Sequence, residues 1–166
     1  MQFTVTETIV ADREAVLRAL VDPDYYARLG EAATAIRAPQ LLSVAEDAGT
    51  IRTSVRYAFA GTISGPAALV VDSDKLTWVI ETTYDTDAHT GTVVVVPDHY
   101  ERMLQCSGTL TLDDDGSGNT LETVSGQLAV RVPLVSSAAE RAIYGGLARH
   151  LELEAMALSE YCAGLR

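Results

Sequence analysis

Residues 134–166 read LVSSAAERAIYGGLARHLELEAMALSEYCAGLR, and apolar side chains recur in this segment every three or four positions. The recurring apolar positions are Ile143, Leu147, Leu151, Ala155, Leu158, Cys162 and Leu165. Because this spacing is the period of an α-helix with one apolar face, we predict one long amphipathic helix over about 135–164. At 1.5 Å per residue it is about 45 Å long, which suits a helix lying across a curved sheet.

The segment before this helix, from residue 34 to 132, alternates polar and apolar residues and is rich in Thr and Val, as β-strands are. Turn signals divide it at 47–49, 85–87, 97–98 and in the acidic loop 113–119. We therefore predict six strands within 34–132. The residues after Ser64-Gly65-Pro66 allow either a short helix near 66–72 or more strand.

The N-terminal segment supplies one more strand and two helices. Phe3, Val5 and Ile9 alternate with polar residues, which predicts a strand over 2–11. Asp12 and Asp22 are good N-caps, and they predict helices over 12–21 and 22–31, the second with Pro23 at its first position.

This order of elements predicts an α+β fold in a single domain over 1–166: a curved, seven-stranded antiparallel sheet wrapped around the C-terminal helix. A curved sheet covers such a helix only in part, so a hollow between the two is expected. Concave, mostly apolar hollows are where proteins bind small molecules.

Composition narrows the classes of partner. The chain has 166 residues, 12 Lys and Arg, 23 Asp and Glu and a net charge of −11, which argues against nucleic acid and anionic lipid surfaces. No run of 18 apolar residues is present, so no membrane insertion is expected, and the residues after Met1 do not read as a secretory signal, so we expect a cytoplasmic protein. Cys106 and Cys162 are then expected to be reduced, small buried side chains.

The inward face of each strand follows from the alternation of its residues, and it gives candidate residues for the wall of the hollow. Aromatic side chains on that face either line a pocket or fill the core. The predicted wall consists of Val55, Tyr57, Trp78, Ile80, Leu104, Leu128, Leu147 and Leu151.

Three polar residues lie in phase with apolar ones. His150 and Glu154 lie on the apolar side of the predicted helix, with Tyr161 two turns further on, and are either a hydrogen-bonding or acid–base pair in the hollow or an i,i+4 pair at its rim. They are the candidate catalytic and polar ligand-binding residues. Glu7 is either a carboxylate in the hollow or, as we favour, an edge residue paired with an arginine.

No metal or cofactor is expected. The loop 113–119 imitates a calcium loop but lacks the bidentate glutamate in the required register, since Glu122 falls on a strand. Nucleophile triads, the Gly-x-Ser-x-Gly elbow and the glycine patterns of dinucleotide and phosphate loops are missing from the sequence.

The chain also resembles a known superfamily. The matching text is Phe3-Thr4-Val5-Thr6-Glu7, Ala11-Asp12-Arg13-Glu14-Ala15-Val16, Asp22-Pro23-Asp24-Tyr25, Gly108-Thr109-Leu110-Thr111-Leu112 and Arg131-Val132-Pro133-Leu134-Val135. In these segments the chain is similar to the START-like superfamily, also called SRPBCC or pollen-allergen-like, and most to an uncharacterised actinobacterial family within it. The resemblance implies the helix-grip fold and binding of lipids, polyketides or other hydrophobic molecules between sheet and helix.

Three functions follow as hypotheses. The first is non-catalytic binding of a hydrophobic small molecule or lipid. The second is a cyclase- or hydrolase-type enzyme that uses His150 and Glu154 in the same hollow. The third is a protein-interaction module whose acidic surface meets a basic partner. The sequence makes no prediction of oligomeric state.

Overall fold

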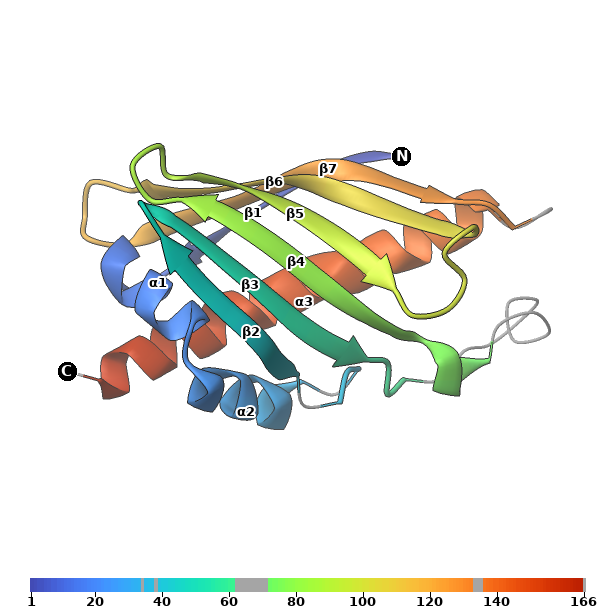
Figure 1. The fold of residues 1–166 in the computed structure, drawn as a ribbon, viewed down its shortest axis with the longest axis horizontal. Helices are drawn as coiled ribbons and strands as arrows, with labels where there is room; N and C mark the ends of the chain where they lie inside the picture. The colour runs from blue at the N-terminus through green and yellow to red at the C-terminus, as the bar shows by residue number, and fades with distance from the viewer. Residues whose placement is uncertain (34, 38, 62–71, 133–135, 166) are drawn as a thin grey trace.

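A computed structural model describes residues 1–33, 35–37, 39–61, 72–132 and 136–165. Seven antiparallel strands form one sheet in the order β1-β7-β6-β5-β4-β3-β2. Two short helices lie at one end of the sheet, and the long helix α3 crosses its inner face (Figure 1). The elements are β1 (Gln2–Ile9), α1 (Arg13–Leu20), α2 (Pro23–Ala32), β2 (Gln40–Asp47), β3 (Thr50–Ala58), a 3₁₀ turn η2 (Ser73–Lys75), β4 (Thr77–Asp85), β5 (Thr90–Pro97), β6 (Leu104–Asp114), β7 (Thr120–Val130) and α3 (Ser136–Gly164).

This architecture confirms the predicted α+β class, the curved seven-stranded sheet and the long C-terminal helix. The first strand ends at Ile9, two residues earlier than predicted, because the chain turns there and the Ala11 N–H donates to the Ile9 carbonyl at 2.9 Å. The short helix expected near 66–72 falls on residues 62–71, which lie outside the described residues.

The caps of the two short helices explain where these helices begin. The Asp12 carboxylate accepts from the Ala15 N–H at 2.8 Å, and the Asp22 carboxylate accepts from the Asp24 N–H at 3.0 Å. Each cap satisfies an N–H that the first turn of a helix leaves unpaired. Asp22 also accepts from the Tyr161 hydroxyl at 2.7 Å, so the same side chain ties the start of α2 to α3.

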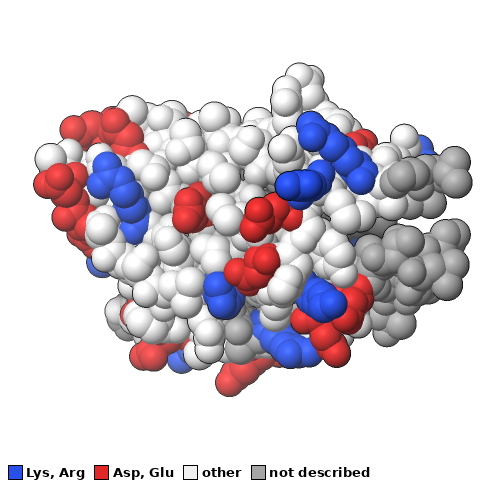
Figure 2. All heavy atoms as spheres, turned by 45° about the vertical axis from the view of Figure 1, so that its right-hand side comes forward, with Lys and Arg blue, Asp and Glu red and all other residues white. Residues whose placement is uncertain are grey.

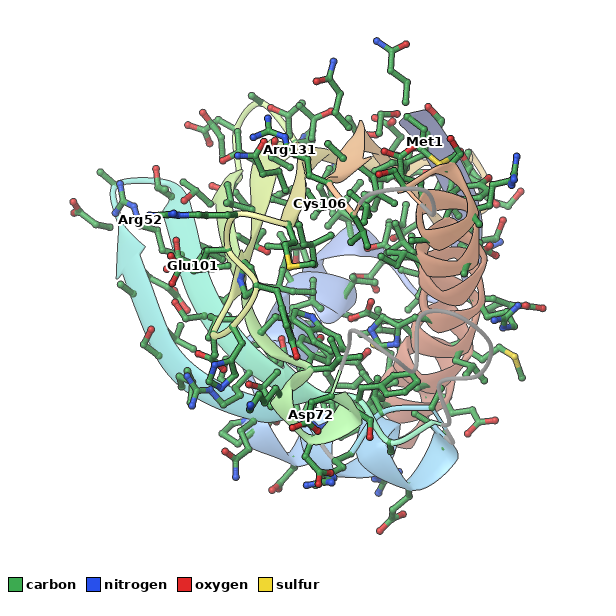
Figure 3. The ribbon with its side chains drawn as sticks, turned by 90° about the vertical axis from the view of Figure 1, so that its right-hand side faces the viewer. Met1, Arg52, Asp72, Glu101, Cys106 and Arg131 are labelled. Carbon is green, nitrogen blue, oxygen red and sulfur yellow. The ribbon has the colours of Figure 1, made fainter. Side chains whose placement is uncertain are left out.

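The helix α3 does not lie evenly on the sheet. It packs most closely against β1 and β7 and against the two short helices, and much less against β3 to β6. Its fully or nearly buried side chains include Leu151, Ala155 and Leu158. The sheet curves around α3, but α3 contacts it mainly at β1 and β7. The helix therefore does not fill the space next to β3 to β6 (Figure 3).

A pair of glycines joins β6 to β7 at close range. Gly108 and Gly126 are register partners, and a Cβ atom built on them would lie 2.2 Å from the Ser125 carbonyl oxygen and 2.4 Å from the Ser107 carbonyl oxygen, respectively. Only glycine permits this approach, since the obstructing atoms are backbone and cannot rotate away.

We therefore expect Gly126→Ala to lower the free energy of unfolding by about 2 kcal/mol, a typical cost of overpacking. Gly146→Ala is the matched control, because Gly146 lies in α3 and a Cβ there meets no described atom within 4 Å. The control variant is expected to gain about 0.5–1 kcal/mol from helix propensity. Urea unfolding measures both changes, and a Gly126→Ala protein as stable as the wild type would contradict the packing described for this glycine pair.

The surface carries the charge of the chain. Acidic and basic side chains are interspersed on the face that Figure 2 shows, without one large patch of a single sign. None of the described helices combines the length and the apolar character needed to span a membrane.

Candidate ligand-binding hollow

A hollow lies between the inner face of the sheet and α3, where the helix does not pack against the strands. The hollow has a volume of about 120 Å³, close to the roughly 150 Å³ of an apolar protein cavity that holds benzene. The described lining residues are Phe3, Leu20, Tyr26, Thr53, Val55, Tyr57, Ile80, Thr82, Val93, Val95, Cys106, Ser107, Gly108, Leu110, Glu122, Val124, Leu147, His150, Leu151 and Glu154. In the end-on view of Figure 3, Cys106 lies on the inner side of the sheet and points toward this space.

The structure brings most of the predicted site residues together at this hollow. Those that line it are Val55, Tyr57, Ile80, Leu147, His150, Leu151 and Glu154. Trp78, Leu104 and Leu128 are not among the described residues that line it.

The reasons for these three exceptions are local. The Trp78 ring stacks on the Tyr57 ring, with centroids 5.9 Å apart and planes 7° apart, and of the two only Tyr57 lines the hollow. Leu128, on β7, is 1% exposed and belongs to the packed core, because α3 lies directly on β7. Leu104 packs, partly buried, against the same core.

His150 and Glu154 both line the hollow, as the first alternative expected, and they form an i,i+4 pair on α3, as the second expected. The His150 Nε2 atom lies 3.9 Å from Glu154 Oε2, and the side chains are 17% and 13% exposed. The Tyr57 ring meets the His150 ring edge to face at 5.4 Å. Burial raises the pKa of Glu154, while His150 and a long hydrogen bond from the Tyr25 hydroxyl, 3.5 Å, act in the opposite direction.

Glu122 is a second carboxylate of the hollow, and it was not among the predicted site residues. It is 6% exposed, and its Oε2 atom accepts no hydrogen bond from any described residue. Burial raises the pKa of Glu122 to about 8, and the nearby charges of Glu154 and Glu7 add to the effect. At neutral pH this carboxyl therefore holds its proton most of the time.

The described residues do not support the favoured interpretation of Glu7. Glu7 is the register partner of Glu122 and is half-buried on the inner face, and the described residues give it no arginine partner. Tyr161 also lies away from the hollow, since its hydroxyl binds Asp22. The hydrogen bond to this carboxylate raises the pKa of Tyr161 to about 12.

Simple alternation along β7 would have found Glu122. Glu122 comes two residues before Val124 and therefore shares the inward phase of the apolar residues. The inward positions of this strand are Thr120, Glu122, Val124, Gly126, Leu128 and Val130. A search for apolar residues passes over such a position, although a carboxylate in an inward phase is the more informative observation.

The chemistry available in the hollow is that of the mostly protonated Glu122 carboxyl and of hydrogen bonding. Burial raises the pKa of the Cys106 thiol, which makes its reactive thiolate scarcer. Within the described part of the chain, no group of three or more His, Cys, Asp or Glu side chains has a geometry that could hold a metal ion.

A hollow enclosed by a curved antiparallel sheet and one long helix defines the helix-grip class, and solved structures of that class align with nearly the whole chain. TTHA0849 from Thermus thermophilus aligns with a TM-score of 0.66 at 14% identity, covering 99% of both chains. Zhui aromatase/cyclase from Streptomyces sp. R1128 also gives 0.66 at 14% identity, covering 98% of this chain and 93% of the other. A START superfamily protein from Mycobacterium smegmatis gives 0.58 at 14% identity and covers 99% of both chains.

These likenesses confirm the fold of the START superfamily. The chain belongs to the family described as "Protein of unknown function (DUF2505)", whose profile matches residues 4–162. No curated protein matches the chain.

Proposed function

We propose that this protein binds a small, mostly apolar molecule in the hollow between its sheet and α3, and that it carries this molecule without transforming it. The observation that supports the proposal most directly is the hollow itself, with its aliphatic and aromatic wall beneath a packed sheet. Its volume of about 120 Å³ suits a group the size of one ring or a short hydrocarbon chain better than a whole lipid.

Trp78 provides the test of this proposal. It is the only tryptophan of the chain, and its ring stacks on Tyr57, which lines the hollow. A molecule that enters the hollow contacts Tyr57 and changes the surroundings of the stacked pair. We expect titration with benzyl alcohol, a neutral one-ring probe, to change the Trp78 emission in a saturable way. An emission that stays constant up to the solubility limit of the probe would contradict the proposal.

Acid catalysis in the same hollow is the second candidate function. It is favoured by the pKa of Glu122, raised to about 8, since a carboxyl that keeps its proton at neutral pH is suited to donate it. Burial raises the pKa of Glu154 as well. One structure with this fold is an aromatase/cyclase. The two functions separate experimentally, because a catalyst loses turnover of its substrate in the Glu154→Gln and His150→Ala variants, whereas a carrier returns its ligand unchanged.

A further inference from the structure

We propose that the ligand of the hollow carries a protonated amine beside a small apolar group, and that the Glu122 carboxylate binds the amine. This inference rests on the proposed binding function and adds to it the chemical class of the ligand. An unpaired acceptor, the balance of charge and the wall of the hollow together specify such a cation.

The unpaired acceptor is Glu122 Oε2. This atom is buried, belongs to a residue that lines the hollow, and has no hydrogen-bond partner among the described residues. A buried acceptor without a partner is costly, and buried polar groups in native proteins nearly always have one. A ligand that brings an N–H donor into the hollow supplies the missing partner.

The titratable groups around Glu122 are mostly carboxyls and tyrosine hydroxyls, which carry a negative charge or none. The titratable groups that act on it or sense its charge come from four elements: Glu7 from β1, Tyr25 from α2, Tyr57 from β3, and Glu154 with its neighbour His150 from α3. No lysine or arginine is among the described residues that line the hollow. A ligand cation balances the charge of an ionised Glu122, whereas a carboxylate or phosphate would be repelled by it.

The rest of the wall specifies the remainder of the ligand. Tyr26 and Tyr57 present aromatic rings to the hollow, and aromatic rings attract cations. Val55, Ile80 and Val124 line it with hydrocarbon. The fit is therefore to a small hydrophobic amine, one with a ring or a short alkyl group next to the ammonium.

The binding of such an amine is coupled to protons. Glu122, with its pKa raised to about 8, is mostly protonated at pH 7 and ionises when an ammonium group arrives. Amine binding at pH 7 is then expected to release up to one proton. Between pH 6 and pH 8 the affinity is expected to rise with pH, by at most about tenfold per unit, because the ionised fraction rises in that way.

A matched series of one-ring probes tests the inference: benzylamine, benzyl alcohol and benzoate, titrated at pH 8 with Trp78 emission and calorimetry as readouts. We expect benzylamine to bind at least about tenfold more tightly than benzyl alcohol and benzoate to bind most weakly, as charge-assisted hydrogen bonds require. Calorimetry at pH 7 in two buffers of different ionisation enthalpy counts the released protons. Glu122→Gln should abolish both the preference for the amine and the proton release, while Glu81→Gln, at an exposed position of β4, should preserve them.

Each outcome has a distinct meaning. If benzyl alcohol binds in the hollow as tightly as benzylamine, or if Glu122→Gln keeps the preference for the amine, the inference is overturned and the binding function stands. If none of the three probes binds, the proposed function fails and the inference fails with it. Retention of a cooperative thermal transition by Glu122→Gln shows that a lost preference does not come from unfolding.

Discussion

The wild-type protein is expected to lose stability as the pH rises from about 5 to 8, and replacing Glu122 by glutamine is expected to abolish most of this loss. In the unfolded chain the pKa of this carboxyl is near 4.5, and burial raises it to about 8 in the folded protein. Between these values the folded protein keeps a proton that the unfolded chain has lost. The free energy of unfolding therefore falls as the pH rises, by at most about 1.4 kcal/mol per pH unit.

Urea unfolding of both proteins across this pH range measures the effect. The stability contributed by the protonated Glu122 is fully present below about pH 4.5 and is lost as the pH approaches 8. The measured quantity is the free energy of unfolding of Glu122→Gln minus that of the wild type. We expect this difference to be higher at pH 8 than at pH 5 by on the order of 3 kcal/mol. Some pH dependence remains in this variant, because burial also raises the pKa of Glu154.

Glu81→Gln serves as the control, since Glu81 is a strand glutamate whose side chain is exposed. This variant should follow the wild type at every pH. If the curves of Glu122→Gln and the wild type instead ran parallel, the Glu122 carboxyl would have an ordinary pKa in the folded protein, and its burial would not have the effect described above.

Filling the hollow is expected to abolish binding while the fold persists. Val95 lies on β5, lines the hollow and is only partly buried, so a phenylalanine at this position has space to extend into. A ring there occupies much of the roughly 120 Å³. We expect Val95→Phe to weaken the binding of benzyl alcohol or benzylamine at least about tenfold, with the Trp78 titration as the readout.

Val94 offers a control one residue away. Its side chain is 42% exposed on the opposite face of the same strand, so Val94→Phe adds the same ring outside the hollow. This variant should bind the probes as the wild type does. Equal loss in both variants would mean that the ring disturbs β5 itself, and equal retention would mean that the probes bind elsewhere.

The sequence predicted the fold almost completely because two simple periods dominate it. A spacing of three to four residues marks α3, and alternation marks the inner face of the strands, as the register partners Val55 and Ile80 illustrate. The helix caps Asp12 and Asp22 are local chemistry that needs no knowledge of the tertiary structure.

The site was harder to predict because alternation tells which face a residue is on and not what covers that face. Leu128 and Val124 share one face of β7, yet Leu128 is buried in the core outside the hollow and Val124 lines the hollow. The place of the hollow depends on which elements α3 packs against, namely β1, β7, α1 and α2. That is a long-range property that no local pattern carries.

Glu122 escaped prediction for a different reason. Burial of a carboxylate without a cation conflicts with the ordinary preference of glutamate for water, so a search for candidate pocket residues by hydrophobicity omits it. Such local conflicts are common at functional sites, where a protein keeps a costly group because its chemistry is needed. The position of Glu122 is thus in itself an argument for a role in binding.

A crystal structure of the protein grown with benzylamine tests the central claim most directly. We expect electron density for the ring between Tyr57 and Val124, with the amine nitrogen within hydrogen-bonding distance of Glu122 Oε2. A hollow filled by protein side chains, or a probe found only on the outer surface while the hollow stays without it, would contradict the account.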